Sequence, residues 1–414
     1  MNYNIGIVGA GPAGYTAALH AAKRGFSVVL FEKDAVGGVC LNRGCIPTKA
    51  ILHSAEVFEE IRTAQELGIE VDGAKVDFGK VIERKNQIVA KLRKSLELMI
   101  KNSKIVVVNA KAEIADKNTV LANGEEYHFD KIICATGSEP KIIRGMEFDH
   151  EKILSSDDVL NLTELPKNIV IVGSGAIGIE WARIFSGFGV EVTIVEAAEN
   201  LLPMADIDVA KRIERLFKLK KIKFFKGIGV DRIENTDRCN VYLSNGEVLE
   251  AEKVLVAVGR EVKNKDCIEG VNYIGDVCCE IQLAHYAIKQ AVEVIDEIPF
   301  DKNFVPSVVY GNPEIAWFGK REQDLEQGSY KKSNLLISAL GKSQCDNAVD
   351  GFIKILTQDN QIVGVHIISK EASSLIQELI IVAQNGISAD KLKEICFAHP
   401  TYSEGIFEAL FNLN

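Results

Sequence analysis

The chain has 414 residues, which is enough for two to four domains with substantial hydrophobic cores. Its hydrophobic fraction of 47% and charged fraction of 26% are ordinary for a globular protein and exclude a disordered or fibrous chain. The net charge of −10 disfavours nucleic acid or an anionic membrane as the main partner. Nine cysteines are few for a secreted disulfide scaffold of this size and odd in number, so most are expected to be free thiols in a reducing compartment.

The N-terminal segment before Lys23 contains no Lys, Arg, Asp or Glu, as a signal peptide would in its apolar core. It nevertheless lacks a basic start, and four glycines and a proline interrupt the apolar run. Elsewhere the chain has no apolar run, free of charges and multiple glycines, that is long enough to span a bilayer. We therefore expect a cytoplasmic protein without a membrane span.

The N-terminal segment, up to Glu32, has the pattern of a strand–helix–strand unit that binds a dinucleotide. The elements are expected at 4–8, 15–24 and 28–31. Gly9 permits a tight turn, Gly11 lets the backbone approach a pyrophosphate, and Gly14 lets the helix pack on the strand. Glu32, at the end of the second strand, is placed to bind ribose hydroxyls. Alone this is weak evidence, because the pattern arises by accident about 0.2 times in such a chain.

The same pattern recurs further along the chain, with every element displaced by the same interval. Strands are expected at 169–172 and 191–195, with a helix through Phe185, and the glycines are Gly173, Gly175 and Gly178. Glu196 ends the second strand, as Glu32 does in the first copy. Two accidents in identical register are improbable, so we predict two dinucleotide-binding domains that exchange electrons. Since neither Ala197 nor Ala198 offers a positive charge for a 2′-phosphate, NAD is favoured over NADP.

A cysteine pair, Cys40 and Cys45, follows the first unit. In an ideal helix, residues five apart have Cα atoms about 8.7 Å apart, whereas a disulfide requires roughly 4.4–6.8 Å. The thiols can therefore bridge only if the backbone leaves the helix between them, and Gly44 supplies that freedom. A redox-cycling disulfide is favoured over two unrelated thiols or half of a metal site. No metal site is predicted, because no second Cys or His pair at zinc spacing accompanies the first.

The stretch CLNRGCIPTK, which runs from Cys40 to Lys49, resembles the active-site signature of the flavin-dependent pyridine nucleotide–disulfide oxidoreductases. It is most similar to the branch that oxidises dihydrolipoamide, since glutathione-type and mercuric reductases typically carry Val at the position of Leu41. The resemblance covers nearly the whole chain. Further matching segments are 135–138 (ATGS), 258–260 (VGR), 273–276 (YIGD) and 283–285 (LAH).

This resemblance implies an α/β fold with two Rossmann-like domains, for FAD and NAD, and an α+β C-terminal dimerisation domain. The expected boundaries are 1–144 and 266–300 for the FAD-binding domain, 145–265 for the NAD-binding domain and 301–414 for the dimerisation domain. In the last domain, strands are expected at 308–316, 351–356 and 362–368, with a helix at 373–384. A long amphipathic helix at 81–100 is expected to pack on the flavin domain.

The resemblance also implies which residues bind the two cofactors. For FAD these are Gly9, Gly11, Gly14, Glu32, Gly38, Thr136, Gly137, Asp276 and Ala284. For NAD they are Gly173, Gly175, Gly178, Glu196 and Gly259.

By the same resemblance, Cys45 is the thiol that faces the flavin as the charge-transfer thiolate, and Cys40 is the outer thiol that exchanges with substrate. Lys49, one helical turn beyond Cys45, is expected near the reducible nitrogen of the flavin and paired with Glu180.

The dithiol substrate also needs a base, because a thiol with a pKa of about 8.5 is mostly protonated at neutral pH. The segment 399–404, HPTYSE, matches the terminal motif of the family. The match implies that His399 is the acid/base and that Glu404 orients its ring and stabilises the imidazolium. In that family this segment reaches the disulfide of the other subunit, which implies a homodimer with shared active sites.

Three features depart from the family pattern. Phe397 stands where the common motif has an additional His, and Ala176 stands where some relatives carry an aromatic gate over the nicotinamide pocket. The connection from Arg260 to Tyr273 is unusually short, so the usual hairpin there is expected to be missing.

Taken together, the resemblance implies oxidation of dihydrolipoamide to lipoamide with reduction of NAD⁺. The expected partners are the lipoyl domains and acyltransferase core of a 2-oxo-acid dehydrogenase complex, or a glycine cleavage complex. Two alternatives stay open: an NADH-dependent reductase of another disulfide or of mercuric ion, and a non-catalytic paralogue that acts as a docking subunit.

Overall fold

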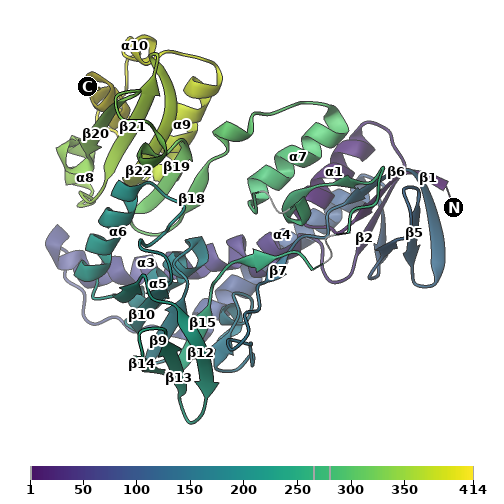
Figure 1. Ribbon diagram of the computed structural model, residues 1–414, viewed down its shortest axis with the longest axis horizontal. Coiled ribbons are helices and arrows are strands. Elements are labelled where there is room, and N and C mark those ends of the chain that lie inside the picture. The colour runs from purple at the N-terminus through teal and green to yellow at the C-terminus, as the bar shows by residue number, and fades with distance from the viewer. Residues whose placement is uncertain (1, 264–265, 279–280, 414) are drawn as a thin grey trace.

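The computed structural model describes residues 2–263, 266–278 and 281–413. Within these residues the chain forms three large sheets, of seven, five and five strands, with helices packed around them (Figure 1). No helix of this described part is long and apolar enough to cross a membrane. The predicted fold class, with two nucleotide-binding sheets and an α+β C-terminal part, is confirmed, whereas the domain boundaries stay a prediction.

The first sheet contains the first glycine loop. Its strands follow the order β3-β2-β1-β6-β5-β4, and β17 joins it by pairing with β6. The strands are β1 (Asn2–Val8), β2 (Val28–Glu32), β3 (Val106–Asn109), β4 (Glu113–Ile114), β5 (Thr119–Ala122), β6 (Glu125–Cys134) and β17 (Asn272–Tyr273). Helices α1 (Pro12–Lys23) and α7 (Ala284–Asp296) lie side by side over it (Figure 1). Every residue of β2 is buried: the apolar run 28–31 as expected for a central strand, and also the acid Glu32 that ends it.

The second sheet repeats this arrangement. Its order is β11-β10-β9-β15-β8, and all of its strands are parallel. The elements are β8 (Ile153–Leu154), β9 (Asn168–Val172), α5 (Ala176–Gly187), β10 (Glu191–Glu196), α6 (Ile207–Leu219), β11 (Lys223–Lys226) and β15 (Lys253–Val256). Helix α5 begins directly after Gly175, and α1 begins directly after Gly11. The two copies of the sequence repeat therefore form the same elements at equivalent positions. A small antiparallel sheet of β12 (Val230–Asn235), β13 (Cys239–Leu243) and β14 (Val248–Ala251) adjoins it.

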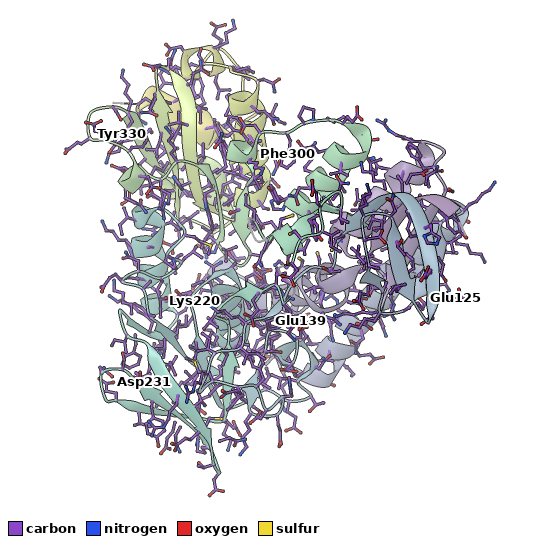
Figure 2. The ribbon with its side chains drawn as sticks, turned by 45° about the vertical axis from the view of Figure 1, so that its right-hand side comes forward. Glu125, Glu139, Lys220, Asp231, Phe300 and Tyr330 are labelled. Atoms are coloured by element: carbon purple, nitrogen blue, oxygen red, sulfur yellow. The ribbon has the colours of Figure 1, made fainter. Side chains whose placement is uncertain are left out.

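The chain crosses between these two sheets twice, along adjacent strands. Strand β7 (Glu139–Pro140) leads out of the first sheet, and β16 (Arg260–Glu261) returns antiparallel to it. Figure 2 shows Glu139 of β7 near the centre of the molecule. The described residues of the connection from β16 to β17 form no hairpin, as its short sequence predicts; residues 264 and 265 lie outside them.

The third sheet is antiparallel, with the order β18-β19-β22-β21-β20. Its elements are β18 (Ser307–Val309), β19 (Glu314–Gly319), β20 (Lys331–Leu336), α8 (Gly341–Cys345), β21 (Phe352–Gln358), β22 (Gln361–Ser369), α9 (Ala372–Gln384), α10 (Ala389–Leu392) and α11 (Glu404–Phe411). The single strand expected at 308–316 is wrong, because the segment forms β18, a turn and β19. Gly311 has a φ of +140° and Pro313 lacks a backbone N–H, so the segment cannot continue as one strand.

Two long helices fill the space between the nucleotide-binding sheets. Helix α3 (Cys45–Thr63) and helix α4 (Phe78–Asn102) pack against each other. The side chain of Asp77 accepts a hydrogen bond from Lys80 N at 3.1 Å and begins α4. Leu96 and Ile100 of α4 join the core of the first sheet, as predicted for this helix.

A buried ionic cluster connects the third sheet to the second. Lys354 Nζ, on β21, is fully buried and lies 2.7 Å from Asp206 Oδ1, 2.7 Å from Asp208 Oδ2 and 2.6 Å from Glu322 Oε2. Burial opposes protonation of Lys354, but the three carboxylates raise its pKa above the ordinary value. Asp206 also begins α6, so the cluster fixes the start of that helix against the C-terminal sheet.

Replacing Lys354 by methionine is expected to lower the free energy of unfolding by about 3–5 kcal/mol, because the carboxylates lose their buried counter-charge. Urea and thermal unfolding would measure this effect. Lys332→Met is the matched control, since Lys332 lies 2.6 Å from Glu322 Oε1 with half of its side chain exposed, and we expect it to cost less than about 1 kcal/mol. Equal effects of the two substitutions would contradict the prediction.

Candidate active site

The two glycine loops have the same backbone conformation. Gly9 and Gly173 have φ values of +100° and +97°, which favour glycine. A Cβ on Gly14 would lie 1.8 Å from the carbonyl oxygen of Gly9, and one on Gly178 would lie 2.0 Å from that of Gly173. The first and third glycines are therefore required by the turn and by close packing of the helix on the strand.

The middle glycines leave space that the protein itself does not fill. A Cβ on Gly175 would meet no atom within 4 Å, and one on Gly11 would meet only the Cα of Gly38, at 3.9 Å. The N-termini of α1 and α5 begin at these glycines, where backbone N–H groups and the helix dipole favour an anion. Each loop thus has the form of a pyrophosphate cradle. Gly38, at φ +57°, brings a second backbone segment against the first cradle.

The two strand-end glutamates are buried and make equivalent hydrogen bonds. Glu32 Oε2 accepts from the backbone N of Ala10 at 2.7 Å. Glu196 Oε2 accepts from the backbone N and the Oγ of Ser174, at 2.7 and 2.6 Å. These carboxylates brace the glycine turns, and their remaining acceptor capacity is available to a ribose hydroxyl.

Two of the segments that match the family, 135–138 and 258–260, lie at equivalent positions in the two sheets. Gly137 follows β6 and Gly259 follows β15, with φ values of +76° and +106°. Thr136 precedes Gly137 in the first of these turns. Helix α7 begins at Ala284, within the segment 283–285 that matches the family.

Asp276 is bonded by Ser138, and Ser138 is held in turn by Arg260. It lies in the short turn after β17, and its Oδ2 accepts a hydrogen bond from Ser138 Oγ at 2.6 Å. Arg260 donates from Nε to Ser138 Oγ at 2.9 Å and from Nη2 to the carbonyl oxygen of Ser138 at 2.7 Å. The carboxylate that the resemblance assigns to FAD binding is therefore oriented by a fixed hydroxyl.

The cysteine pair lies where the backbone leaves helical geometry. Helix α2 (Gly38–Arg43) contains Cys40, Gly44 has φ −147° and ψ −112°, and Cys45 begins α3. This break between the cysteines is the one that the spacing predicts. A Cβ on Gly44 would lie 3.0 Å from the carbonyl oxygen of Val39, so the break is also tightly packed. Both thiols are partly buried and free.

The surroundings of the pair favour a thiolate on Cys45. The Cys40 thiol donates a hydrogen bond to Cys45, and this bond, helped by the Lys49 ammonium and opposed by burial, lowers the pKa of Cys45 to about 7. The same hydrogen bond raises the pKa of Cys40. Cys45 also stands at the N-terminus of the long helix α3, whose dipole favours negative charge. The two thiols are thus chemically distinct before any substrate binds.

Lys49 and Glu180 form a close ion pair beside Cys45. Lys49 Nζ, on α3, lies 2.9 Å from both carboxylate oxygens of Glu180, on α5. The glutamate is buried and the lysine is about 30% exposed. Nearby carboxylate and thiolate charges raise the pKa of Lys49 although burial lowers it, so the ammonium is retained.

The C-terminal histidine forms a second pair, away from the cysteines. His399 Nδ1 lies 2.6 Å from Glu404 Oε1, and Thr401 N donates to Glu404 Oε2 at 2.8 Å. These contacts hold the pKa of Glu404 below its ordinary value. The His399 side chain is 76% exposed, and none of the contacts that the structure describes for it involves Cys40 or Cys45 of the same chain.

Comparison with known proteins agrees with this geometry. The pyridine nucleotide-disulphide oxidoreductase family matches residues 3–291, and the dimerisation domain of that family matches residues 305–410. The chain belongs to this family. It therefore carries the oxidoreductase part and the dimerisation domain in one polypeptide.

Several members of the family are similar over nearly their full length. The dihydrolipoyl dehydrogenases of Mycoplasma genitalium and Bacillus subtilis are 34% and 33% identical, over 98% of this chain and 97% of each relative. The alignment with the M. genitalium protein spans 445 residues, so that relative has segments that this chain lacks. LpdA from Mycobacterium tuberculosis has the same fold, with a TM-score of 0.91 and 23% identity over 99% of both chains. The HOCl-induced flavoprotein disulfide reductase RclA from Escherichia coli gives 0.87 and 25%, also over 99% of both chains.

The structure shows what surrounds two of the residues at which this chain departs from the family pattern. The Phe397 ring, at the position of the additional histidine, packs against Phe407 with 6.1 Å between ring centroids. An apolar contact thus replaces a titratable group near His399. Ala176 is the first residue of α5, beside the second cradle, and carries no aromatic ring to cover it.

Some residues of this oxidoreductase site were not assigned from the sequence. Ser138 and Arg260 lie in segments that match the family, but the sequence does not predict that Ser138 binds Asp276 or that Arg260 binds Ser138. Tyr310 was not singled out, although its backbone N donates to Glu180 Oε1 at 3.1 Å from a distant part of the chain. Such contacts depend on the tertiary fold, and only the glycine at 311 and the proline at 313 marked a turn there.

Gly178→Ala is expected to weaken NAD binding by about tenfold or more, because the new Cβ overlaps the Gly173 carbonyl and the second cradle must shift. The KM for NAD⁺ would measure this effect, and FAD content would report on the first cradle. Gly14→Ala is the matched variant and should reduce FAD content instead. The assignment of the cradles would be contradicted if both variants lost the same cofactor.

Proposed function

We propose that this enzyme oxidises dihydrolipoamide to lipoamide and reduces NAD⁺, using FAD and a Cys40–Cys45 disulfide. The observation that carries the proposal is the polarised thiol pair, in which Cys45 has a pKa of about 7 beside the Lys49–Glu180 ion pair. The relatives of 33% and 34% identity that carry the name dihydrolipoyl dehydrogenase support this substrate among those of the family.

We assign FAD to the first cradle and NAD to the second. The first cradle borders the cysteine pair through Gly11 and Gly38, whereas Glu196 of the second suits an unphosphorylated ribose. The first cradle would hold FAD, and FAD would supply the hydride-transfer chemistry that links the thiol pair with NAD⁺.

The protein's own residues perform a dithiol–disulfide exchange. In the oxidised enzyme, a dihydrolipoamide thiol gives its proton to His399 of the partner subunit, and the thiolate attacks Cys40 Sγ. The Cys40–Cys45 bond breaks and Cys45 leaves as the thiolate. The second substrate thiol then attacks the mixed disulfide, so that lipoamide leaves with its own S–S bond and Cys40 takes up a proton. Two electrons now reside on the cysteine pair.

The His399–Glu404 pair and the Lys49–Glu180 pair support different steps of this exchange. Glu404 binds His399 Nδ1, which leaves Nε2 to exchange the proton with the substrate thiol. The Lys49 ammonium stabilises the thiolate that leaves on Cys45, and Glu180 keeps that ammonium in place. A base that is exposed and far from its thiol pair in the chain is consistent with an active site shared between two subunits.

The dimerisation domain supports a homodimer. We further propose that its partners are the lipoyl domains and acyltransferase core of a 2-oxo-acid dehydrogenase complex, or a glycine cleavage complex. Cys345 and Cys396 are exposed free thiols, which suits the reducing cytoplasm, and we place the enzyme there.

Steady-state assays with lipoamide, glutathione disulfide and Hg²⁺ side by side test the substrate. We expect lipoamide to give by far the highest kcat/KM, and a preference for either other substrate would overturn the proposal. Anaerobic titration with dihydrolipoamide adds a direct readout of the thiol pair. Reduction should produce a long-wavelength thiolate–flavin band, and an unchanged flavin spectrum would identify a non-catalytic docking subunit instead.

A further inference from the structure

The turn between β18 and β19 contacts both members of the Lys49–Glu180 pair. The backbone N–H of Tyr310 donates to Glu180 Oε1 at 3.1 Å. The Tyr310 ring faces the ammonium of Lys49, with 4.6 Å from Nζ to the ring centroid. One residue of the C-terminal unit therefore contacts a pair that otherwise comes from α3 and α5.

This turn is fixed in place by a buried arginine. Arg183 lies on α5 one helical turn beyond Glu180, and its Nη1 donates to the carbonyl oxygens of Tyr310 at 3.1 Å and Pro313 at 2.9 Å. A Cβ on Gly311 would lie 2.5 Å from Arg183 Cδ, so the guanidinium arm and the turn are in close contact. The backbone that carries the Tyr310 ring is therefore hydrogen-bonded to α5, the helix that also carries Glu180.

An aromatic face is well suited to the side of Lys49 that Glu180 leaves free. A cation within about 6 Å of a ring centroid is attracted by the π electrons, and more strongly where water is partly excluded. A second carboxylate there would also hold the lysine, but it would raise the pKa of Cys45, as the charge of Glu180 already does. The neutral ring orients the ammonium and leaves its full charge to act on the thiolate.

We propose that Tyr310 is a positioning residue, whose ring and backbone N–H together hold the Lys49 ammonium toward Cys45. The dimerisation unit thereby contributes to the thiol chemistry of its own subunit, separately from His399, which serves the partner. The inference rests on the proposed use of Cys45 as the thiolate. It does not depend on which disulfide is the substrate.

The test compares Tyr310→Leu, which removes the ring and keeps the backbone N–H, with Tyr310→Phe, which keeps the ring. Both are made in a Cys40→Ser background of the holoenzyme. The serine keeps a hydroxyl donor beside Cys45, and Cys45 is then the one thiol of the pair whose alkylation is measured. The measurement is the rate of Cys45 alkylation by iodoacetamide against pH, followed by mass spectrometry of the Cys45 peptide. We expect Tyr310→Leu to raise the pKa of Cys45 by about half a unit or more, and Tyr310→Phe to leave it unchanged.

An unchanged pKa in Tyr310→Leu would overturn the proposal, and so would an equal rise in both variants, which would assign the effect to the hydroxyl. Should Tyr310→Leu not fold, Tyr310→Met offers a flexible side chain without a ring and carries the same expectation. Lys49→Met sets the upper limit of the effect. Failure of the wild-type enzyme to turn over lipoamide would refute the proposed substrate and leave this thiol measurement unaffected.

Discussion

Cys45→Ser is expected to lower lipoamide-dependent NAD⁺ reduction by at least about 10³-fold, with FAD still bound. A serine hydroxyl cannot form or release a disulfide bond, and its pKa lies far above that of the thiol, which the surroundings hold at about 7. The substituted group has nearly the same size, so the packing around the break at Gly44 should persist. Steady-state kinetics with lipoamide and the visible flavin spectrum would measure the two effects.

Cys345→Ser is the matched control, because Cys345 is a free and exposed thiol on α8. We expect it to retain wild-type kinetics. A Cys45→Ser enzyme with near-normal turnover would eliminate the disulfide mechanism and leave hydride transfer without thiols as the activity.

His399→Gln is expected to lower kcat/KM for dihydrolipoamide by about 10²–10⁴-fold, the usual contribution of a general base. Glutamine can still accept a hydrogen bond but cannot take up the substrate proton. The loss should shrink as pH rises toward the pKa of the substrate thiol, because the substrate then ionises without help. A pH profile of kcat/KM measures this, and a loss that is independent of pH would argue for a structural role.

Co-expression of His399→Gln with Cys45→Ser distinguishes shared from separate active sites. If the histidine serves the partner, a heterodimer contains one intact site, built from the cysteines of one subunit and the histidine of the other, and should show about half of the wild-type activity. If each chain uses its own histidine, both sites of the heterodimer are defective. Absence of recovery in isolated heterodimers would therefore refute the shared site.

Much of the fold and of the thiol site follows from local sequence. The glycine pattern occurs twice because the first and third glycines of each copy meet steric demands within their own turn, and the structure repeats φ values and helix bounds accordingly. The helix break at Gly44 is equally local, since it follows from the reach of a disulfide and the rise of a helix.

Contacts between segments that lie far apart in the chain could not be predicted from local sequence. Lys354 looks like one of many surface lysines, yet the fold buries it against Asp206 and Glu322. The segment 308–316 suggested one strand although Gly311 and Pro313 interrupt it, and nothing near them in the sequence indicates that Arg183 binds the turn. In each case the contacting residue lies far away in the chain, and the sequence pattern of the segment itself does not indicate that contact.

The paired strands β7 and β16 bear on how this family tolerates changes in length. Because β16 is bonded to β7 and β17 is bonded to β6, both ends of the connection between them are anchored. We therefore expect insertion or deletion between those anchors to leave both sheets in place. A change in length at this connection is therefore compatible with the shared fold, and this chain aligns with LpdA over 99% of its residues.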